Sequence, residues 1–370
     1  MKKIKDIVND AHDPKFYDIR TDFERFPDVT YYAVWSRRGP GKTFSLLRYC
    51  YVEGIKPLYI KRRNDDIDML CNDEDDETGN PYKPLNDMFG TNIRIIKKKR
   101  KKGQARIVEF DDEGNELRTI GHVLSLAAVS KLKGFDFQDP AMSIVCFDEF
   151  IPMAGEIVRR AEGDMFYNLL KTVERARQDM IIEDPSIKPL KVVLFANAES
   201  PVSPITTTNK WTDDIVEMYM KGEDVRIIRD GCVMLHNLQR EFALSEERIS
   251  GIDRGMKGTK AYKKAVGGEF LIDVSNIKNV SIKGYKCLVH ISYNEDDWYV
   301  YQHRINQTYH VCRSPHKCDR NYDFDRDVDL RRYLAKENIT FREAIIRDKM
   351  TFESYTMYDT MINFVKRFDL

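Results

Sequence analysis

Short apolar runs rich in β-branched and aromatic residues alternate, in the first part of the chain, with segments whose apolar residues recur at helical spacing. In chain order, these predict elements at 29–35 (strand), 43–52 (helix), 57–60 (strand), 142–147 (strand), 165–178 (helix) and 191–196 (strand). Short buried strands that alternate with helices are typical of a parallel sheet covered on both faces. The pattern therefore predicts an α/β fold for this part of the chain.

A second pattern interrupts this alternation. Residues 94–100, 105–110 and 117–126 predict three strands joined by turns, which together form a β-meander. The first turn carries the basic run Lys97-Lys98-Lys99-Arg100-Lys101-Lys102. A hairpin tip of this kind can contact DNA phosphates, or it can be an ordinary solvated turn. Because no aromatic residues are interleaved, the run does not resemble a platform for single-stranded bases.

The alternation fades after about residue 230. Residues 245–268 are polar and rich in glycine and lysine, whereas 287–293 and 298–303 predict strands and the stretch from 331 onwards predicts helices. These shifts predict an α/β domain over 1–230, a linker region over 231–268 and a smaller α+β domain over 269–370.

The bulk composition excludes some classes of protein. The chain has 60 basic and 60 acidic residues and a formal net charge of +0, so it is not a globally basic nucleic-acid binder. No apolar run reaches the ~18 residues that span a bilayer, and residues 1–13 lack a signal-peptide core, so no membrane partner is expected. The seven cysteines are scattered and odd in number, which favours a reducing cytosol over a disulfide framework.

The strongest motif follows the strand at 29–35 and opens the helix at 43–52. It reads Ser36-Arg37-Arg38-Gly39-Pro40-Gly41-Lys42-Thr43, which fits a Walker A loop in the strand–loop–helix context that this loop requires. Lys42 is expected to reach the β- and γ-phosphates of ATP and Thr43 to hold Mg²⁺. Ser36 departs from the usual pattern, which has a glycine there. A chance Gly-Lys-Thr turn is the alternative, and the flanking strand and helix disfavour it.

The second half of the predicted nucleotide site ends the strand at 142–147. Asp148 is expected at the carboxyl end of that strand, where open α/β sheets bind ligands, and would bind Mg²⁺. Glu149 follows it and is placed to deprotonate the attacking water, which indicates ATP hydrolysis. Asn197 ends the next strand and is a candidate contact to the γ-phosphate, although a turn or cap role fits it equally well.

Three arginines are candidates for stabilising charge during phosphoryl transfer. Arg38 lies in the predicted Walker A loop and could act within its own subunit. Arg175 and Arg177 end the helix at 165–178 and point to different faces of it, so that one could reach a neighbouring subunit. A solvated surface arginine is the alternative for each.

Several short segments, in this order, resemble the phi29-type bacteriophage DNA-packaging ATPases, which are terminase-like members of the ASCE class of P-loop proteins. The segments are 38–42, Tyr59-x-x-Arg62, 145–150, 172–175 and Asn197-Ala198, with weaker matches at 245–248, 268–270 and 289–293. The resemblance implies a homo-oligomeric ring, usually of five subunits, on the portal of an empty capsid. Such a ring pumps double-stranded DNA inward with ATP and Mg²⁺, in the host cytoplasm, and a packaging RNA is a further partner in some members.

The resemblance also assigns residues that spacing alone does not. Arg175 matches the arginine finger that acts on a neighbouring subunit. Lys131 or Lys133 falls near a lysine that acts across the same interface, and a length difference before Asp148 leaves the choice between them open. The C-terminal domain is implied to be RNase H-like.

A working two-metal nuclease needs three or four converging acids. The strand at 287–293 carries no acid, and Asp296 and Asp297 lie in the following turn, where they favour a hairpin. The sequence therefore predicts a vestigial nuclease fold used for docking. A terminase with an active nuclease and a nucleotide-binding scaffold remain the alternatives.

The last candidate is a Cys/His cluster, His310, Cys312, His316 and Cys318. It lacks the paired Cys-x-x-Cys of most zinc sites, so a metal site is disfavoured.

Overall fold

The computed structural model describes residues 13–71, 79–98, 101–131, 135, 137–153, 155–156, 158–159, 161–243, 249–268, 270 and 272–368. The chain divides into two compact units. The first unit comprises 1–154, 161–200 and 220–271, and the second comprises 155–160, 201–219 and 272–370.

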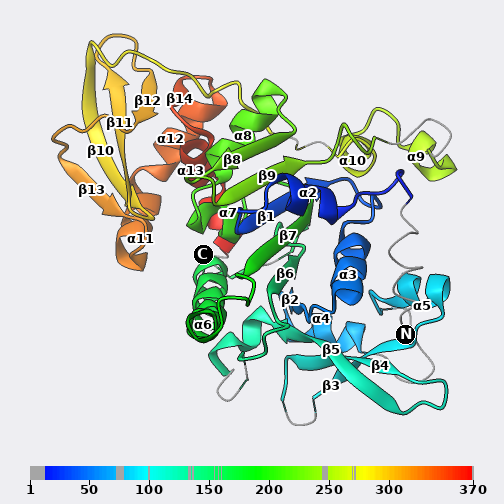
Figure 1. The fold of residues 1–370 in the computed structure, drawn as a ribbon. Helices are drawn as coiled ribbons and strands as arrows, with labels where there is room; N and C mark the ends of the chain where they lie inside the picture. Colours follow the sequence, from blue (N-terminus) through cyan, green and yellow to red (C-terminus); the bar gives the residue numbers. More distant parts are fainter. Residues whose placement is uncertain are drawn as a thin grey trace. The chain divides into compact units, whose positions relative to one another are not determined.

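The first unit is a mixed α/β structure (Figure 1). Its strands are β1 (Tyr31–Ser36), β2 (Leu58–Lys61), β3 (Ile93–Lys97), β4 (Gln104–Phe110), β5 (Glu116–Ser125), β6 (Ile144–Asp148), β7 (Lys191–Asn197), β8 (Val225–Ile228) and β9 (Val233–Asn237). Its helices are α2 (Ile19–Arg25), α3 (Lys42–Glu53), α4 (Asn64–Leu70), α5 (Lys83–Phe89), the 3-10 turn η1 (Leu126–Lys131), α6 (Glu162–Glu183), α9 (Gly251–Gly255) and α10 (Lys260–Ala265).

Among the described residues these strands form one nine-stranded sheet in the order β3-β4-β5-β2-β6-β7-β1-β9-β8. The strands from β5 to β9 in this order run parallel, while β3, β4 and β8 pair antiparallel at the two edges. The predicted meander is therefore confirmed, but it extends the central sheet through the parallel pairing of β5 with β2 instead of standing apart. Hydrogen bonding between strands distant in the chain decided this.

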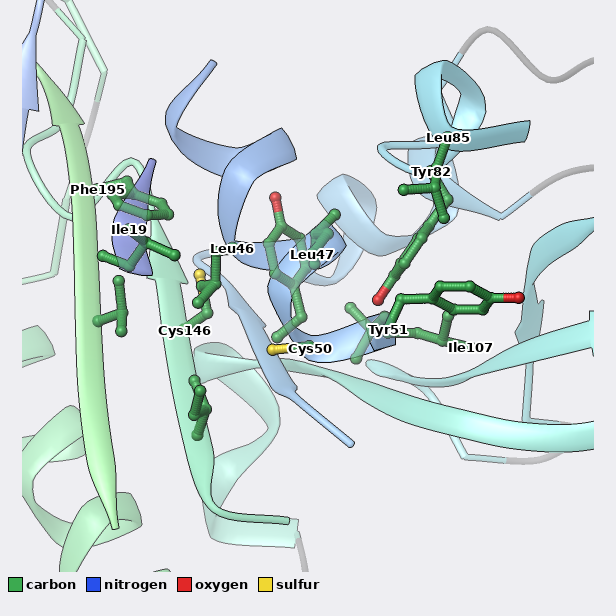
Figure 2. Packing of buried hydrophobic residues seen from close by; sticks show 14 of the residues in the cluster. Ile19, Leu46, Leu47, Cys50, Tyr51, Tyr82, Leu85, Ile107, Cys146 and Phe195 are labelled. Carbon is green, nitrogen blue, oxygen red and sulfur yellow. The ribbon is translucent and has the colours of Figure 1, made fainter. Parts of the chain in front are cut away.

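The two faces of the sheet are covered by different helices. The helix α3 lies on one face and α6 on the other (Figure 1). On the α3 side, Leu46, Leu47 and Cys50 are buried against strand residues such as Cys146 and Phe195, as Figure 2 shows. On the α6 side, the ring of Phe166 packs 5.3 Å from that of Phe147. The strands are apolar on both faces for this reason, as the sequence pattern predicts.

A buried polar cluster ties the N-terminal helix α2 to strand β9. The Asp22 carboxylate accepts a hydrogen bond from the Tyr17 hydroxyl (2.5 Å) and lies 2.9 Å from Nδ1 of His236. Burial lowers the pKa of His236, but hydrogen bonds and charges from Asp22 and Glu241 outweigh that effect and raise it to about 9. The His236 ring is therefore protonated and paired at neutral pH.

The second unit contains a smaller sheet. Its elements are α7 (Pro204–Thr208), α8 (Thr212–Lys221, of which the last two residues belong to the first unit), β10 (Tyr285–Tyr293), β11 (Asp296–His303), β12 (Tyr309–Cys312), β13 (Arg320–Asp323), α11 (Asp327–Lys336), α12 (Asn338–Ile346), β14 (Met350–Phe352) and α13 (Tyr355–Phe368). Among the described residues five strands pair in the order β13-β10-β11-β12-β14. Asn294 and Glu295, both at positive φ, form the two-residue turn between β10 and β11.

The domain limits differ from the predicted ones. Residue 230 falls in the turn between β8 and β9, and β9 pairs parallel with β1, so the large sheet continues past this residue. The first unit includes residues up to 271, so the region expected as a linker carries a sheet strand and two helices. In its described part, residues 249–268, this polar, glycine-rich region forms short helices and turns on the surface.

Candidate functional site

The loop between β1 and α3 has the backbone that its glycines allow. Gly39 and Gly41 have φ values of 91° and 85°, which side chains with a Cβ rarely adopt. Gly41 is the N-cap of α3, so the unpaired N–H groups of the first helical turn follow directly after the loop. This arrangement provides the partial positive charge that binds phosphate groups.

Lys42 and Ser36 contact each other across this loop. The Lys42 ammonium donates to the Ser36 hydroxyl (2.6 Å) and to the Arg37 carbonyl (3.3 Å). Burial lowers the pKa of Lys42 to about 8, and the positive charge of Arg37 adds to this while Asp148 opposes it. The serine in place of the usual glycine therefore gives the buried ammonium a hydrogen-bond partner, a role that the sequence pattern did not reveal.

The acids predicted from the sequence meet this loop at the carboxyl edge of the sheet. Asp148 ends β6, and its carboxylate lies 3.3 Å from the Thr43 hydroxyl and 2.5 Å from the Tyr59 hydroxyl. Burial and the nearby Asp148 charge raise the pKa of Tyr59 well above its usual value, so this hydroxyl donates. The Lys61 ammonium lies 3.7 Å from a carboxylate oxygen of Asp148 and 3.7 Å from one of Glu149.

Tyr59 and Lys61 are site residues whose roles the sequence reasoning missed. Both come from β2, which lies beside β6 in the sheet although it is distant from it in the chain. Their alternation on the strand was the available signal, but only the order of the strands shows that they face the acids.

The loop between β1 and α3 and the acids at the end of β6 surround one cavity of about 350 Å³. The residues that line it are Arg38, Gly39, Pro40, Gly41, Lys42, Thr43, Phe44, Asp148, Glu149, Ala196 and Asn197. Most of the residues predicted for the nucleotide site thus lie around a single opening.

The other predicted residues of the loop and strand ends lie as follows. Asn197 ends β7 beside Ser36 and lines the cavity. The exposed Arg38 lines it too, and its guanidinium contacts the Met153 sulfur (2.9 Å). Arg37 points elsewhere, because its Nε donates to the Phe242 carbonyl (3.1 Å).

The two arginines of α6 have different surroundings. Arg177 is 2% exposed and donates to the carbonyls of Pro140, Met142 and Lys188. Arg175 is exposed on the same helix. Arg177 is therefore occupied in holding loops together, and Arg175 is the one that is accessible. Lys133 lies outside the described residues, and Lys131 ends η1.

The segment before residue 271 reaches the predicted phosphate-binding loop. Gly268 has a φ of 63°, and a Cβ at this position would lie 2.7 Å from the Arg37 backbone nitrogen. Lys264 pairs with Glu199 (3.0 Å), close to the end of β7. Sequence reasoning treated this segment as a linker, and only the close backbone approach at Gly268 shows that it borders the site.

The basic run lies between β3 and β4, as predicted. Lys97 pairs with Asp68, and the Lys98 ammonium lies 4.9 Å from the centroid of the Phe135 ring. Lys101 and Lys102 are exposed, whereas Lys99 and Arg100 lie outside the described residues. Part of the run is thus engaged with its own domain.

The two acids at the start of β11 pair with different partners. Asp296 pairs with Lys210 (3.3 Å), and Asp297 pairs with Nε2 of His290 (2.7 Å). Across the described part of the chain, no group of three or more His, Cys, Asp and Glu side chains is arranged to hold a metal ion.

The Cys/His cluster of the sequence is divided by the fold. Cys318 forms a disulfide with Cys287, 31 residues earlier, and His310 Nδ1 lies 2.9 Å from the Thr351 hydroxyl. The expectation that the cysteines are unpaired is therefore wrong for this pair, because β13, which begins shortly after Cys318, pairs with β10, which contains Cys287. In the described residues, no helix is both long enough and apolar enough to cross a bilayer.

The chain matches no protein-family model, and no curated protein sequence matches it. One chain of the bacteriophage Phi-29 viral genome packaging motor assembly superposes with a TM-score of 0.62 at 15% sequence identity, over 95% of this chain and 99% of that one. The Thermus phage P74-26 large terminase ATPase domain matches 69% of this chain and 94% of its own length, with a TM-score of 0.35 at 11% identity. The HK97 bacteriophage large terminase matches 92% of this chain and 70% of its own length, also with a TM-score of 0.35 at 11% identity.

The fold is thus a mixed α/β fold with a large, mostly parallel sheet and a second, smaller sheet domain, as the sequence predicts. Within that class the chain has the fold of a phi29-type packaging-motor ATPase along nearly its whole length, which confirms the resemblance at the level of the fold.

Proposed function

We propose that this chain is an ATP-driven motor that moves viral double-stranded DNA into a capsid. The observation that carries the proposal is the convergence of Lys42, Thr43, Asp148 and Glu149 on one cavity of about 350 Å³, at the carboxyl edge of a parallel sheet. ATP hydrolysis needs a phosphate-binding loop, metal-binding oxygens and a carboxylate that can act as a base, all in one place. The fold shared with the packaging-motor chain supplies the biological context.

The roles of the site residues follow from their positions. The N–H groups at the start of α3 and the Lys42 ammonium bind the phosphates, and ATP would relieve Lys42 of its contact with Ser36. Thr43 and Asp148 hold Mg²⁺, which neutralises phosphate charge when bound. Glu149 takes the proton from the attacking water, and Asn197 and Arg38 orient the γ-phosphate side of the site.

The proposed arrangement of subunits follows from the resemblance to the packaging ATPases and from the exposure of Arg175. The exposed Arg175 acts on the ATP of a neighbouring subunit in a homo-oligomeric ring, for which five subunits are expected, and Lys133 or Lys131 acts across the same interface. The ring sits on the portal of an empty capsid in the host cytoplasm, with a packaging RNA as a further partner.

The hairpin between β3 and β4 contacts DNA through its basic run, of which Lys101 and Lys102 are exposed. Replacing Lys99, Arg100 and Lys101 by alanine is expected to weaken DNA binding and to flatten its dependence on salt, since fewer counterions are released. An unchanged affinity across a salt series contradicts this role. The second unit serves as a vestigial, RNase H-like docking domain.

The test is steady-state ATP hydrolysis at increasing protein concentration, with and without linear double-stranded DNA. Sites shared between subunits predict a turnover per chain that rises steeply with concentration and is stimulated by DNA. Turnover that is linear in protein and indifferent to DNA, with the portal protein present as well, contradicts the motor and favours a self-contained ATPase. The variant Lys42→Ala is the control for contaminating ATPase.

A further inference from the structure

The backbone of Glu149 has an uncommon conformation. Its φ is 63°, in the left-handed region that residues other than glycine rarely adopt, and such a conformation persists only where the surroundings hold it. On one side the next amide, that of Phe150, donates to the Phe195 carbonyl of β7 (3.0 Å). This bond alone leaves the carbonyl groups of the turn without a fixed position.

Arg62 holds the turn from the other side. It follows directly after β2, and its side chain is 7% exposed. Its Nη2 donates to the Glu149 carbonyl (2.9 Å) and contacts the Phe150 carbonyl (3.4 Å), and its guanidinium lies 5.6 Å from the centroid of the Phe147 ring. Adjacent residues in extended backbone point to opposite sides. Lys61 therefore contacts the Glu149 side chain, whereas Arg62 contacts the Glu149 backbone carbonyl.

The same guanidinium is anchored to helix α6. Its Nε lies 2.9 and 3.0 Å from the two carboxylate oxygens of Glu162, the first residue of α6, which is itself 4% exposed at its side chain. A buried arginine needs such a partner, and a carboxylate at a helix N-terminus is also favoured by the helix dipole. The planar guanidinium can serve both groups at once, which a lysine ammonium cannot do with the same geometry.

We propose that Arg62 is a positioning residue that fixes the Glu149 turn and, through Glu162, joins it to the helix that carries Arg175. This inference rests on the proposed function. It means that the carboxylate serving a subunit's own ATP and the arginine presented to the neighbour's ATP belong to one rigid unit. A shift of α6 at the interface between subunits then moves the Glu149 turn. This movement provides a route by which neighbouring subunits hydrolyse ATP in sequence.

The first test measures the turn itself in the full chain without nucleotide. The double variant Arg62→Met/Glu162→Leu removes both buried charges together, and an apolar pair of similar size in place of a buried ion pair generally preserves folding. Amide hydrogen exchange of the peptide covering 148–153 is expected to become about tenfold faster, because the strained turn loses its support. The matched control is Arg63→Met, at an exposed neighbouring position, which leaves exchange unchanged.

The second test measures ATP turnover and binding. The double variant is expected to lose about 10²-fold in kcat with an unchanged affinity for a fluorescent ATP analogue, because a misplaced base costs about this much in rate without weakening binding. Arg62→Lys keeps the charge but not the planar guanidinium, so its kcat is expected to lie between that of the wild type and that of the double variant. If Arg62 has only a structural role, the folded double variant should hydrolyse ATP at the same rate as the wild type.

The outcomes separate the two proposals. A folded double variant with unchanged exchange at 148–153, or with wild-type kcat, overturns the role of Arg62. A wild-type chain that hydrolyses no ATP under any assembly condition overturns the proposed function instead, and the exchange measurement alone then decides whether Arg62 holds the turn.

Discussion

Each of the two sheets carries a pair of adjacent acids at one end of a strand, but the two pairs have different surroundings. At the edge of the nine-stranded sheet, Asp148 and Glu149 share a cavity with Lys42 and Thr43. In the five-stranded sheet, Asp296 and Asp297 pair singly with Lys210 and His290. The comparison teaches that chemistry depends on convergence, because a phosphoryl-transfer site needs several groups within reach of one substrate whereas an isolated ion pair only satisfies charge.

The largest expected effect concerns ATP turnover at the edge of the nine-stranded sheet. Arg175→Ala is expected to lower ATP turnover in an assembled ring by about 10³-fold, since an arginine finger contributes 10³ to 10⁵ in rate. Rings that mix this variant with Glu149→Gln subunits should recover part of the activity, because each variant lacks a different half of the shared site. Wild-type turnover of Arg175→Ala in an assembled ring contradicts the assignment.

Arg177, two residues from Arg175 on the same helix, provides the matched control. Arg177→Ala should lower the free energy of unfolding by about 3 kcal/mol, because it removes a buried side chain and leaves the carbonyls of Pro140, Met142 and Lys188 without their donor. Chemical denaturation checks this, and Arg175→Ala should leave the unfolding midpoint unchanged.

Glu149→Gln should lower the rate of ATP hydrolysis by about 10²- to 10⁴-fold while ATP still binds, because the amide is isosteric but cannot accept the proton of water. Single-turnover hydrolysis with a parallel binding titration separates the two steps. A rate near that of the wild type means that another group is the base.

Two carboxylate–histidine pairs, one buried in the first unit and one exposed in the second, extend the comparison to the free energy of unfolding. Asp22→Asn is expected to cost about 3 kcal/mol at pH 6.5, because the buried His236 charge loses its nearer carboxylate at 2.9 Å and keeps only Glu241 at 3.7 Å. Asp297→Asn should change stability by less than about 0.5 kcal/mol, since that pair is exposed.

The pH dependence of the first pair has a definite sign. The folded-state pKa of His236 is raised from 6.5 to about 9, so its stabilisation is complete below pH 6.5 and is lost as the pH rises through 9. The difference in unfolding free energy between the wild type and Asp22→Asn should therefore shrink between pH 6.5 and pH 10 in urea titrations. A difference that does not vary with pH contradicts the assigned protonation.

The smallest expected effect concerns the second unit. Plasmid DNA incubated with the chain and Mg²⁺ or Mn²⁺ should remain intact, because two-metal cleavage needs converging acids. Cleavage that persists in Lys42→Ala would show an active nuclease and favour the terminase alternative.

The sequence alone determined much of the first domain. The strand–loop–helix at 31–53 and the acid pair after β6 were predicted because each is local, and adjacent residues create both the periodicity and the motif. The hairpins β3–β4 and β10–β11 were predicted for the same reason.

Only the tertiary structure decided which distant segments meet. The place of β9 beside β1, the approach of Gly268 to Arg37, and the disulfide between Cys287 and Cys318 depend on pairing that leaves no periodic trace in the sequence. The same holds for Tyr59, Lys61 and Arg62, which acquire their partners because β2 lies beside β6. A local pattern records which face of an element is buried, whereas its neighbours are chosen by the packing of the whole chain.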